Sequence, residues 1–428
     1  MLQVSIRDLL RVFGKIGLLS FGGPAAQIAL MHRELVVQRP WINEQQFLGA
    51  LSFCMMLPGP EAMQLATFSG WRLRGIIGGL IAGCLFILPG ATVITVLGII
   101  YNNFGSMPLV QSAFLGIKAA VVVIVVQALI KLAAKTLHCH FDYSLAAVAF
   151  LGIFLFAIPF PFLIIGAGLA GLLFATTKED SITSRGSTII DETSFLKTIQ
   201  TILIWGTIWT GPLLILWLSG HVFLTKVGLF FSKLALVTFG GAYAVLAYMT
   251  QTVVTEFDWL STTQMIDALG LAETTPGPLI LITQFVAMQA GFGLGNIGLA
   301  IAAGGVALWM TFIPCFLLVF AGAPYFNYLS QKPQLAAFLS GVTAAIVGVI
   351  FNLSVWFALN IWFESVELRR AGVLQFLLPN WQSFAPESFL MTMIAAWALL
   401  RRGISIASTL GGMAILCCAT NALIDKVT

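Results

Sequence analysis

The feature that most constrains this chain is an internal duplication that places helix-breaking motifs twice inside apolar sequence. Aligned without a gap, residues 13–60 match residues 231–278 at 17 of 48 positions. The first copy contains Phe21-Gly22-Gly23-Pro24 and Leu57-Pro58-Gly59-Pro60, and the second contains Phe239-Gly240-Gly241 and Thr275-Pro276-Gly277-Pro278. Glycine and proline both interrupt helices, so the duplication predicts one unit used twice, with breaks at matching positions.

The alignment resumes beyond residue 60 after a shift of seven residues. Pro89 then matches Pro314, and Pro108 matches Pro333. A duplicated hydrophobic unit with broken helices is typical of transporters whose binding site lies near the repeat interface, at the middle of the membrane.

The composition indicates an integral membrane protein. Hydrophobic residues make up 59% of the 428 residues, charged residues make up 9%, and the mean hydropathy is +0.98. Apolar stretches of about 20 residues are long enough to span ~30 Å of hydrocarbon as helices, and they lack the alternation of a β-barrel. We therefore expect an all-α polytopic membrane protein. The net charge of +4 is spread over loops, so no nucleic-acid surface is expected, and no cluster predicts a metal site or a cofactor.

The duplication and the hydropathy together predict the domain organisation. It comprises a first transmembrane repeat over 1–177, a cytoplasmic linker over 178–197, an extra transmembrane helix over 198–220 and a second transmembrane repeat over 226–428. The extra crossing would deliver the second repeat from the opposite face, so the two halves are predicted to be inverted relative to each other.

Loop charges agree with this inversion. The loops flanking the second break carry four arginines in the first copy, whereas the equivalent loops of the second copy, 250–258 and 291–296, carry neither Lys nor Arg. By the positive-inside rule the arginine-bearing loops lie in the cytoplasm, and both flank one interrupted segment. A re-entrant hairpin explains this better than a broken spanning helix. The segment 364–370 counts against the topology, because it is predicted outside and holds two arginines.

The breaks predict an anion site. Each break leaves helix N-terminal N–H groups unpaired, with a partial positive charge of roughly half a unit, where water is scarce. An anion is the natural partner of such groups, although a lone Gly or Pro in a membrane helix more often only kinks it. Since the four breaks are paired by the repeat, we favour binding. The backbone candidates are Gly22, Gly23, Pro24, Pro58, Gly59, Pro60, Gly240, Gly241, Pro276 and Gly277.

Ionisable residues inside apolar segments add further candidates. Lys15 and Lys233 occupy the same repeat position just before the glycine pairs, where two cations would suit a dianion; snorkelling to the interface is the alternative. Glu61 and Glu273 flank the later breaks, and each would serve as a proton carrier, a gate or a helix cap. Asp267 is a third candidate for proton coupling or gating.

Neutral side chains near the breaks complete the predicted site. Gln27, Thr274 and Thr275 are candidate substrate contacts, and Gln64 and Gln284 are secondary ones. Lys118, deep in an apolar segment, would pair with an acid or face a cavity.

These motifs together resemble the chromate ion transporter family. The resemblance rests on Phe21-Gly22-Gly23-Pro24, on residues 57–62 with Gln64-Leu65-Ala66, and on Gly240-Gly241-Ala242-Tyr243 followed by residues 273–278. It covers almost the whole chain, in the long two-domain form. Membership would imply a bacterial inner-membrane carrier with oppositely oriented halves that exports chromate and confers chromate resistance. Ala242 stands where the first copy has Pro24, so the two breaks need not bind alike.

The membrane potential makes export of a dianion easy. Expelling two negative charges from an inside-negative cell gains ~4.6 kcal/mol per 100 mV, whereas import would need two or more co-transported protons. Alternatives remain: a transporter of the same architecture for sulfate or another oxyanion, an anion channel, and a membrane enzyme. The sequence has no phosphate loop, CxxC pair or haem motif to support the enzyme. Protons are candidate partners, and a homodimer is a candidate assembly.

Overall fold

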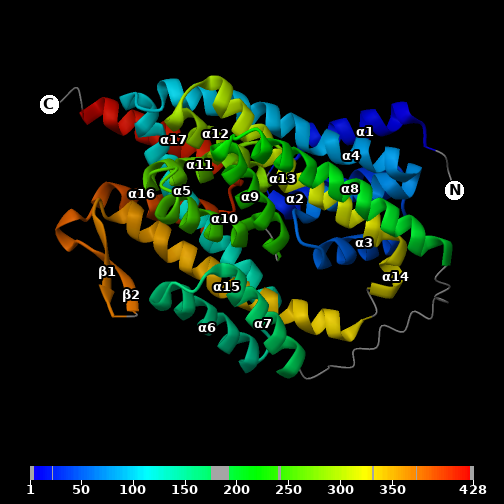
Figure 1. Ribbon diagram of the computed structural model, residues 1–428. Helices are drawn as coiled ribbons and strands as arrows, with labels where there is room; N and C mark the ends of the chain where they lie inside the picture. Colours follow the sequence, from blue (N-terminus) through cyan, green and yellow to red (C-terminus); the bar gives the residue numbers. More distant parts are fainter. Residues whose placement is uncertain are drawn as a thin grey trace. The chain divides into compact units, whose positions relative to one another are not determined.

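A computed structural model describes residues 4–21, 23–174, 192–239, 242–329, 332–372 and 374–424, most of them in helices (Figure 1). Three of the predicted site residues, Gly22, Gly240 and Gly241, lie outside the described residues, as does most of the predicted linker over 178–197.

The chain between Ile6 and Phe174 is almost entirely helical. They are α1 Ile6–Leu19, α2 Gly23–His32, the π-helix η1 Arg33–Gln38, α3 Glu44–Met56, α4 Glu61–Phe104, α5 Pro108–Thr136, α6 His140–Phe156 and α7 Phe160–Phe174. α1 is one continuous amphipathic helix, because Ser5 caps its start and nothing interrupts it before Ser20.

The helices after the linker begin with α8 Glu192–Leu218, which has no counterpart in the first copy. They continue as α9 Val222–Val237, α10 Ala242–Gln251, η2 Thr252–Glu256, α11 Thr262–Thr274, η3 Leu279–Leu281, α12 Ile282–Leu294, α13 Ile297–Gly322, η4 Ala323–Tyr325, α14 Phe326–Leu329, α15 Pro333–Trp362, η5 Trp381–Ser383, α16 Pro386–Ala396, η6 Trp397–Arg401 and α17 Ile406–Ile424.

Local structure repeats along with the sequence. In the first copy, Asn43 and Gln46 exchange hydrogen bonds between side chain and backbone at the start of α3. Ser261 and Gln264 make the same reciprocal cap at the start of α11. The π-helices η1 and η2 also occupy matching positions. The duplication therefore preserves caps and irregular turns as well as apolar residues.

Helix length distinguishes full spans from partial ones. Among the described residues, five helices are long and apolar enough to cross a membrane: α4, α5, α8, the run Ile297–Tyr325 and α15. By contrast α1, α2 and α3 contain 14, 10 and 13 residues. At ~1.5 Å per residue they are too short for ~30 Å of hydrocarbon. The interrupted segments are thus built from partial-depth helices.

α4 is itself folded back at Arg74-Gly75. Gly75 has φ +63°, a left-handed conformation, and it joins two helical arms. The arms lie so close that a Cβ atom added to Gly70 would be 2.2 Å from the carbonyl oxygen of Gly78. Residues 61–73 and 76–89 are of similar length, so the second arm returns Pro89 to the level of Pro60.

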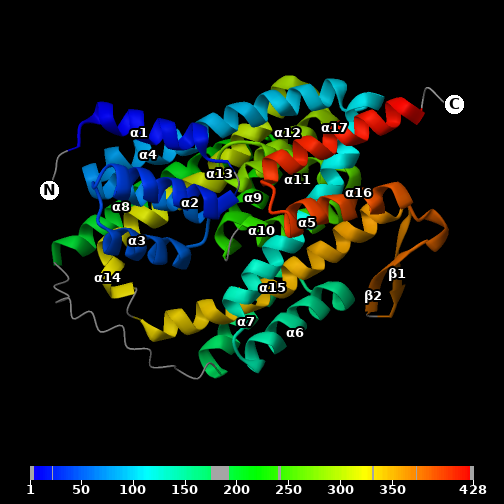
Figure 2. The same cartoon turned by 180° about the vertical axis from the view of Figure 1, so that it is seen from behind.

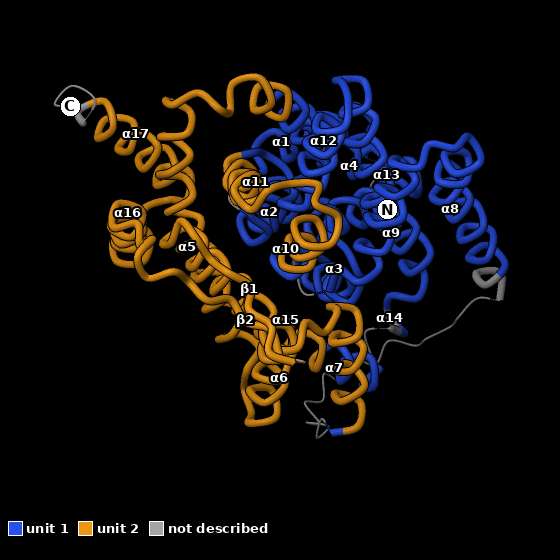
Figure 3. The backbone as a smooth tube through the Cα atoms, turned by 60° about the vertical axis from the view of Figure 1, so that its left-hand side comes forward, with its two compact units in different colours: residues 1–96, 174–245, 275–339 blue, residues 97–173, 246–274, 340–428 orange. Residues whose placement is uncertain are grey.

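The chain forms two compact units, shown in Figure 3. Unit 1 comprises Met1–Val96, Phe174–Val245 and Thr275–Leu339, and unit 2 comprises Leu97–Leu173, Leu246–Thr274 and Ser340–Thr428. Each unit therefore contains segments of both sequence repeats, and all four helix breaks lie in unit 1.

Small residues hold unit 2 together. α6 and α7 run beside α15 in both Figure 1 and Figure 2. A Cβ atom added to Gly341 or Gly348 of α15 would lie 2.3 Å or 2.0 Å from a carbonyl oxygen, of Ala167 and Ala146 respectively. Only glycine permits so close an approach of membrane helices.

Unit 2 also contains a short β-hairpin, which the all-α prediction did not include. β1 Val366–Ala371 pairs antiparallel with β2 Leu374–Pro379. Most of the charged segment 364–370 lies in this hairpin, where Glu367, Arg369 and Arg370 are exposed on β1. The alternation of apolar and charged residues over 366–369 was a usable signal for a strand.

Candidate functional site: the helix breaks of unit 1

The first break joins the last one. α1 ends at Leu19, and the carbonyl oxygen of the buried Ser20 accepts a hydrogen bond of 2.8 Å from the N–H of Gly277. Gly277 has φ +92°, which favours glycine. The end of α1 and the Pro276-Gly277-Pro278 turn are therefore bound backbone to backbone.

The second break joins the third in the same way. The N–H of Gly59 donates a hydrogen bond of 2.8 Å to the carbonyl oxygen of Thr238, and Gly59 has φ +124°. Thr238 and Gly59 are the repeat equivalents of Ser20 and Gly277. Ser20 and Thr238 also share a local contact, since each hydroxyl donates to the carbonyl four residues earlier.

This reciprocal exchange has the form of a two-fold pseudo-axis. One residue of each copy donates to the partner residue of the other copy, as in an isologous contact. The exchange joins the first break to the fourth and the second to the third, within unit 1. Two homologous halves related by a two-fold axis produce such paired contacts.

Two buried glutamines fasten the breaks further. Nε2 of Gln27, on α2, donates to the carbonyl oxygen of Gly277 at 2.6 Å. Nε2 of Gln64, on α4, donates to the carbonyl oxygen of Pro58 at 2.7 Å. Gln27 is 1% exposed and Gln64 is 0% exposed, so both contacts are shielded from solvent. As placed, both glutamines hold the backbone of the breaks.

The spanning helices α4 and α13 pass directly against the breaks. A Cβ atom added to Gly90 of α4 would lie 2.2 Å from the carbonyl oxygen of Pro276. At the repeat-equivalent position α13 carries Cys315, and a Cβ atom added to Gly59 would lie 2.8 Å from its sulfur. The site prediction missed Gly90 and Cys315. The matched prolines Pro89 and Pro314 directly before them were the available signal.

The start of α2 has open space beside the backbone of Gly23. Gly23, its first residue, has φ +79°, and a Cβ atom added there would meet nothing within 4 Å. Pro24 lies in the first turn, and Pro60 directly precedes α4. The first N–H groups of helices such as α2 and α4 have no intrahelical acceptor. Together with the helix dipoles, these groups can bind an oxyanion without a cationic side chain.

Lys15 belongs to an ion cluster at the far end of α2. Its Nζ lies 2.6 Å from Oε1 of Glu34, and Arg39 lies 2.7 Å from the other oxygen. Glu34 is completely buried. Burial opposes its ionisation, but the hydrogen bond and charge of Lys15, together with Arg39, hold the pKa of this carboxyl below its usual value. Sequence reasoning did not single out Glu34.

The other charged candidates occupy different surroundings. Lys233, on α9, has an exposed side chain, and the matching position to Glu34 in the second copy is Thr252. Glu61 is half-buried in the first turn of α4, where the helix dipole favours a carboxylate. Glu273 is buried near the end of α11.

The remaining candidates divide between the two units. Thr275 is buried in unit 1, directly before the fourth break. The hydroxyl of Thr274 donates to the carbonyl oxygen of Leu271, and Gln284 donates to Ala91 and Thr95 in unit 1. Asp267 lies in unit 2, paired with Lys118.

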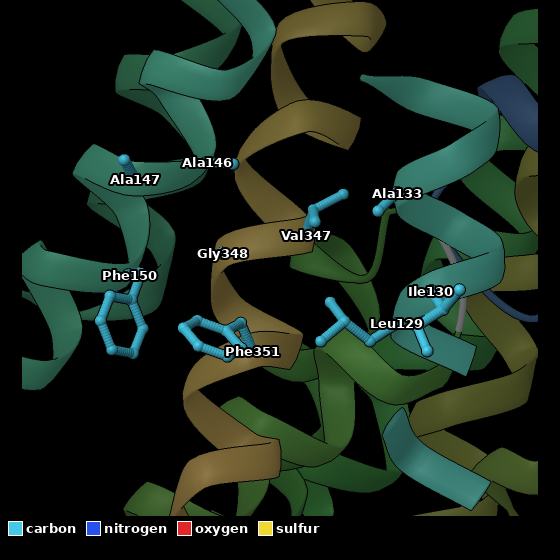
Figure 4. A pocket seen from close by; sticks show the side chains of 9 residues that line it. All are labelled: Leu129, Ile130, Ala133, Ala146, Ala147, Phe150, Val347, Gly348 and Phe351. Atoms are coloured by element: carbon cyan, nitrogen blue, oxygen red, sulfur yellow. The ribbon is translucent and has the colours of Figure 1, made fainter. Parts of the chain in front are cut away.

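A cavity in unit 2 offers a contrast to the breaks. Its volume is about 430 Å³, and only apolar residues of α5, α6 and α15 line it, among them Leu129, Phe150 and Phe351 (Figure 4). An oxyanion there would lose its hydration without gaining a hydrogen bond, which is prohibitive for a dianion. The helix breaks therefore remain the better candidate site.

Comparison with known proteins agrees with this architecture. The profile of the family described as "Chromate transporter" matches residues 7–172 and 225–420, one match in each half. The chain belongs to the chromate transporter family. Members of this family are membrane transporters rather than enzymes, and the two matches correspond to the two homologous halves.

Relatives of the same family cover most of the chain. A "Chromate transport protein" of Cupriavidus metallidurans is 32% identical over 353 residues, covering 81% of each chain. A "Probable chromate transport protein" of Synechococcus elongatus is 31% identical over 354 residues, covering 81% of this chain and 83% of the relative. A "Chromate transport protein" of Pseudomonas aeruginosa is 30% identical over 351 residues, covering 81% and 80%. No solved structure matches the chain.

Proposed function

We propose that this protein is a secondary transporter that exports chromate across the bacterial inner membrane and thereby confers chromate resistance. The anion binds at the helix breaks of unit 1. The observation that carries this proposal is the reciprocal hydrogen bonding of Gly277 to Ser20 and of Gly59 to Thr238. It joins the breaks in two pairs within unit 1, next to helix starts whose N–H groups can hold a tetrahedral oxyanion, and relatives named for chromate transport cover most of the chain.

Export follows from the electrostatics of the substrate. An inside-negative potential expels a dianion with a gain of ~4.6 kcal/mol per 100 mV. The membrane potential alone is therefore sufficient to drive export. Uptake of the same dianion would need at least two co-transported protons to cancel its charge against the potential. The two oppositely oriented halves supply equivalent half-sites on which access can alternate.

Flux measurements in proteoliposomes test the proposal. Chromate efflux should follow an imposed potential, should saturate with chromate, and should be inhibited by sulfate at higher concentration. Flux that rises without saturation would indicate an anion channel. Stronger inhibition by sulfate than by chromate itself would indicate a sulfate transporter with the same site.

A variant of Gln27 tests the location of the site. Gln27→Val introduces the residue that the second copy carries at Val245, and it removes the donor to the carbonyl oxygen of Gly277. Loss of such a buried hydrogen bond, which leaves its acceptor unpaired, costs about 1–3 kcal/mol of stability. If this cost falls on the binding-competent arrangement of the fourth break, the chromate affinity falls roughly 5- to 150-fold. Gln111→Val, at an exposed position of α5, is the matched control. Equal affinities in both variants would place the substrate elsewhere.

Charged candidates are tested in the same assay. Lys15→Ala, Lys233→Ala, Glu61→Gln and Glu273→Gln separate binding from coupling. A lysine that contacts the anion should lower affinity when removed, and a coupling carboxylate should change the dependence on the pH gradient. If all four variants transport like the parent, the backbone of the breaks alone binds the substrate.

A further inference from the structure

Unit 2 contains a buried ion pair that the anion site does not use. Nζ of Lys118, on α5, lies 3.0 Å from Oδ1 of Asp267, on α11, and the hydroxyl of Tyr101, at the end of α4, donates to Oδ2 at 2.7 Å. The Asp267 side chain is 7% exposed and that of Lys118 is 18% exposed. Ionisable residues placed this deep in membrane helices are costly and are usually functional.

The duplication provides an internal control for this network. By the same alignment, Asp267 corresponds to Gly49, Tyr101 corresponds to Phe326, and Lys118 corresponds to Thr343. The contact itself is preserved within unit 1, because a Cβ atom added to Gly49 would lie 2.9 Å from Cζ of Phe326. The ring tip of Phe326 thus lies where the other copy has the Asp267 side chain.

The apolar copy is well packed. Phe326 packs edge to face against Phe53 and at a tilt against Phe68, with ring centroids 5.8 Å and 5.9 Å apart. The fold therefore forms the same helix contact without any charge. Replacing a buried ion pair by apolar groups is generally neutral or stabilising, so stability does not explain why one copy carries three polar side chains.

We infer that Asp267 binds the coupling proton of the transporter, with Lys118 as the counter-ion that the proton replaces and Tyr101 as the donor that orients the carboxylate. In one state the carboxylate is ionised and paired with the ammonium. In the other it carries a proton on Oδ1, and the pair no longer attracts. The equation balances as carboxylate plus proton giving carboxylic acid, with Lys118 charged throughout.

The neighbourhood of Asp267 suits such an exchange. The elements packed on α11 contribute Lys118 from α5 and Tyr101 from α4. On α11 itself the other acid is Glu273, six residues further on. Among the described contacts, those of the Asp267 side chain are with Lys118 and Tyr101. When the Asp267 carboxylate is protonated it becomes neutral, and its attraction to the ammonium of Lys118 is lost.

This inference rests on the proposed transport function, and the experiment separates the two. The full-length protein is reconstituted with a trapped pH-sensitive dye, and chromate movement is measured in response to a pH gradient at zero potential. In the parent, the pH gradient alone should drive chromate against its concentration gradient, with proton movement recorded by the dye. A parent that moves chromate but never protons overturns the inference and leaves the transporter proposal intact.

Paired substitutions avoid leaving a lone buried charge. Asp267→Asn with Lys118→Met removes both charges, and Asp267→Gly with Tyr101→Phe and Lys118→Thr installs the residues of the apolar copy. Both variants should fold with parental thermal stability, exchange chromate across the membrane and lose proton-driven accumulation. Proton-driven accumulation equal to the parent overturns the inference. Loss of all chromate exchange in a folded variant also overturns it, because the pair would then serve the anion.

Infrared spectroscopy provides a readout independent of flux. The carboxylic acid band that distinguishes the parent from Asp267→Asn should appear as the pH falls, and Lys118→Met should move its appearance to higher pH, because the ammonium no longer favours the ionised form. A band with the same pH dependence in both backgrounds would show that Lys118 is not the counter-ion. If no oxyanion is transported in any assay, the proposed function is wrong. The carboxylic acid band would still show whether Asp267 binds a proton.

Discussion

Substituting Gly90 by alanine should displace the backbone of the fourth break, and so distort the candidate anion site, without changing any charged group. A Cβ atom at this position would lie 2.2 Å from the carbonyl oxygen of Pro276 and 2.4 Å from Cδ1 of Leu281. The first contact is with backbone, so rotation of a side chain cannot relieve it. α4 or the fourth break must therefore shift, and the N–H of Gly277 moves relative to the carbonyl oxygen of Ser20.

The magnitude follows from two opposing terms. Forcing an extra methyl group into packed structure costs about 1–3 kcal/mol, whereas replacing glycine by alanine inside a helix gains about 0.5–1 kcal/mol. At their midpoints these terms leave a net destabilisation of about 1 kcal/mol, with about 2.5 kcal/mol as the upper limit. If this strain falls on the binding-competent arrangement of the break, the Kd for chromate rises roughly 5-fold, and about 70-fold at the upper limit.

Gly305 of α13 is the matched control. A Cβ atom there would meet nothing within 4 Å, and the first copy carries Leu80 at the same repeat position. Gly305→Ala should therefore keep the parental Kd and show equal or higher thermal stability. Both variants are measured in detergent by thermal unfolding and chromate binding. Identical Tm and Kd values for the two variants would refute the close packing of α4 against the break.

Two further predictions concern the second break and the ion cluster of α2. Gly59→Ala, at φ +124° and with Nε2 of Gln64 2.7 Å and the sulfur of Cys315 2.8 Å from the new Cβ, should lower stability by about 1–3 kcal/mol. Adding Cys315→Gly should relieve only the contact with the sulfur, and full recovery of stability would contradict the role of the backbone conformation. The folded-state pKa of Glu34 is lowered. The contribution of its ionised carboxylate to the free energy of unfolding is therefore complete above the unfolded-state pKa of about 4.3, and it is lost as the pH falls through the folded-state pKa. Glu34→Gln should therefore cost about 2 kcal/mol at neutral pH and should flatten the acid limb of the Tm profile, and an unchanged acid limb would be the contrary result.

The sequence was sufficient to predict the parts of the fold that the duplication and the glycines encode. The breaks at Pro24, Pro60 and Pro278 separate helices as expected, and the turn between the arms of α4 comes at Gly75, next to the predicted Arg72 and Arg74 loop. These positions are predictable because a missing N–H or a positive φ acts locally.

The packing partners of the breaks could not be predicted in the same way. Nothing local indicates that the N–H of Gly59 bonds to Thr238 rather than to a ligand, since the two residues are far apart in sequence. The ion pair of Lys15 with Glu34 was missed for a related reason. Glu34 lies in a polar segment that suggests solvent, and only the π-helical turn of η1 buries it.

Differences between the copies indicate where the chemistry lies. The scaffold is symmetric: Ser20 and Thr238, Gly59 and Gly277, and the caps of α3 and α11 match in residue type and in contact. A strictly symmetric inverted repeat would treat both faces of the membrane alike, so direction must come from asymmetric positions.

Three of the asymmetric positions lie at the contacts described above. Gln27 faces the fourth break, whereas its equivalent, Val245, cannot donate a hydrogen bond to the second. Gly90 has no side chain beside the fourth break, whereas Cys315 places its sulfur beside the second. Asp267 carries a charge where Gly49 carries none. Exchanging Gln27 with Val245 between the copies should therefore change affinity or the preferred direction while leaving the fold intact, because each copy already accommodates one of the two residues at this position.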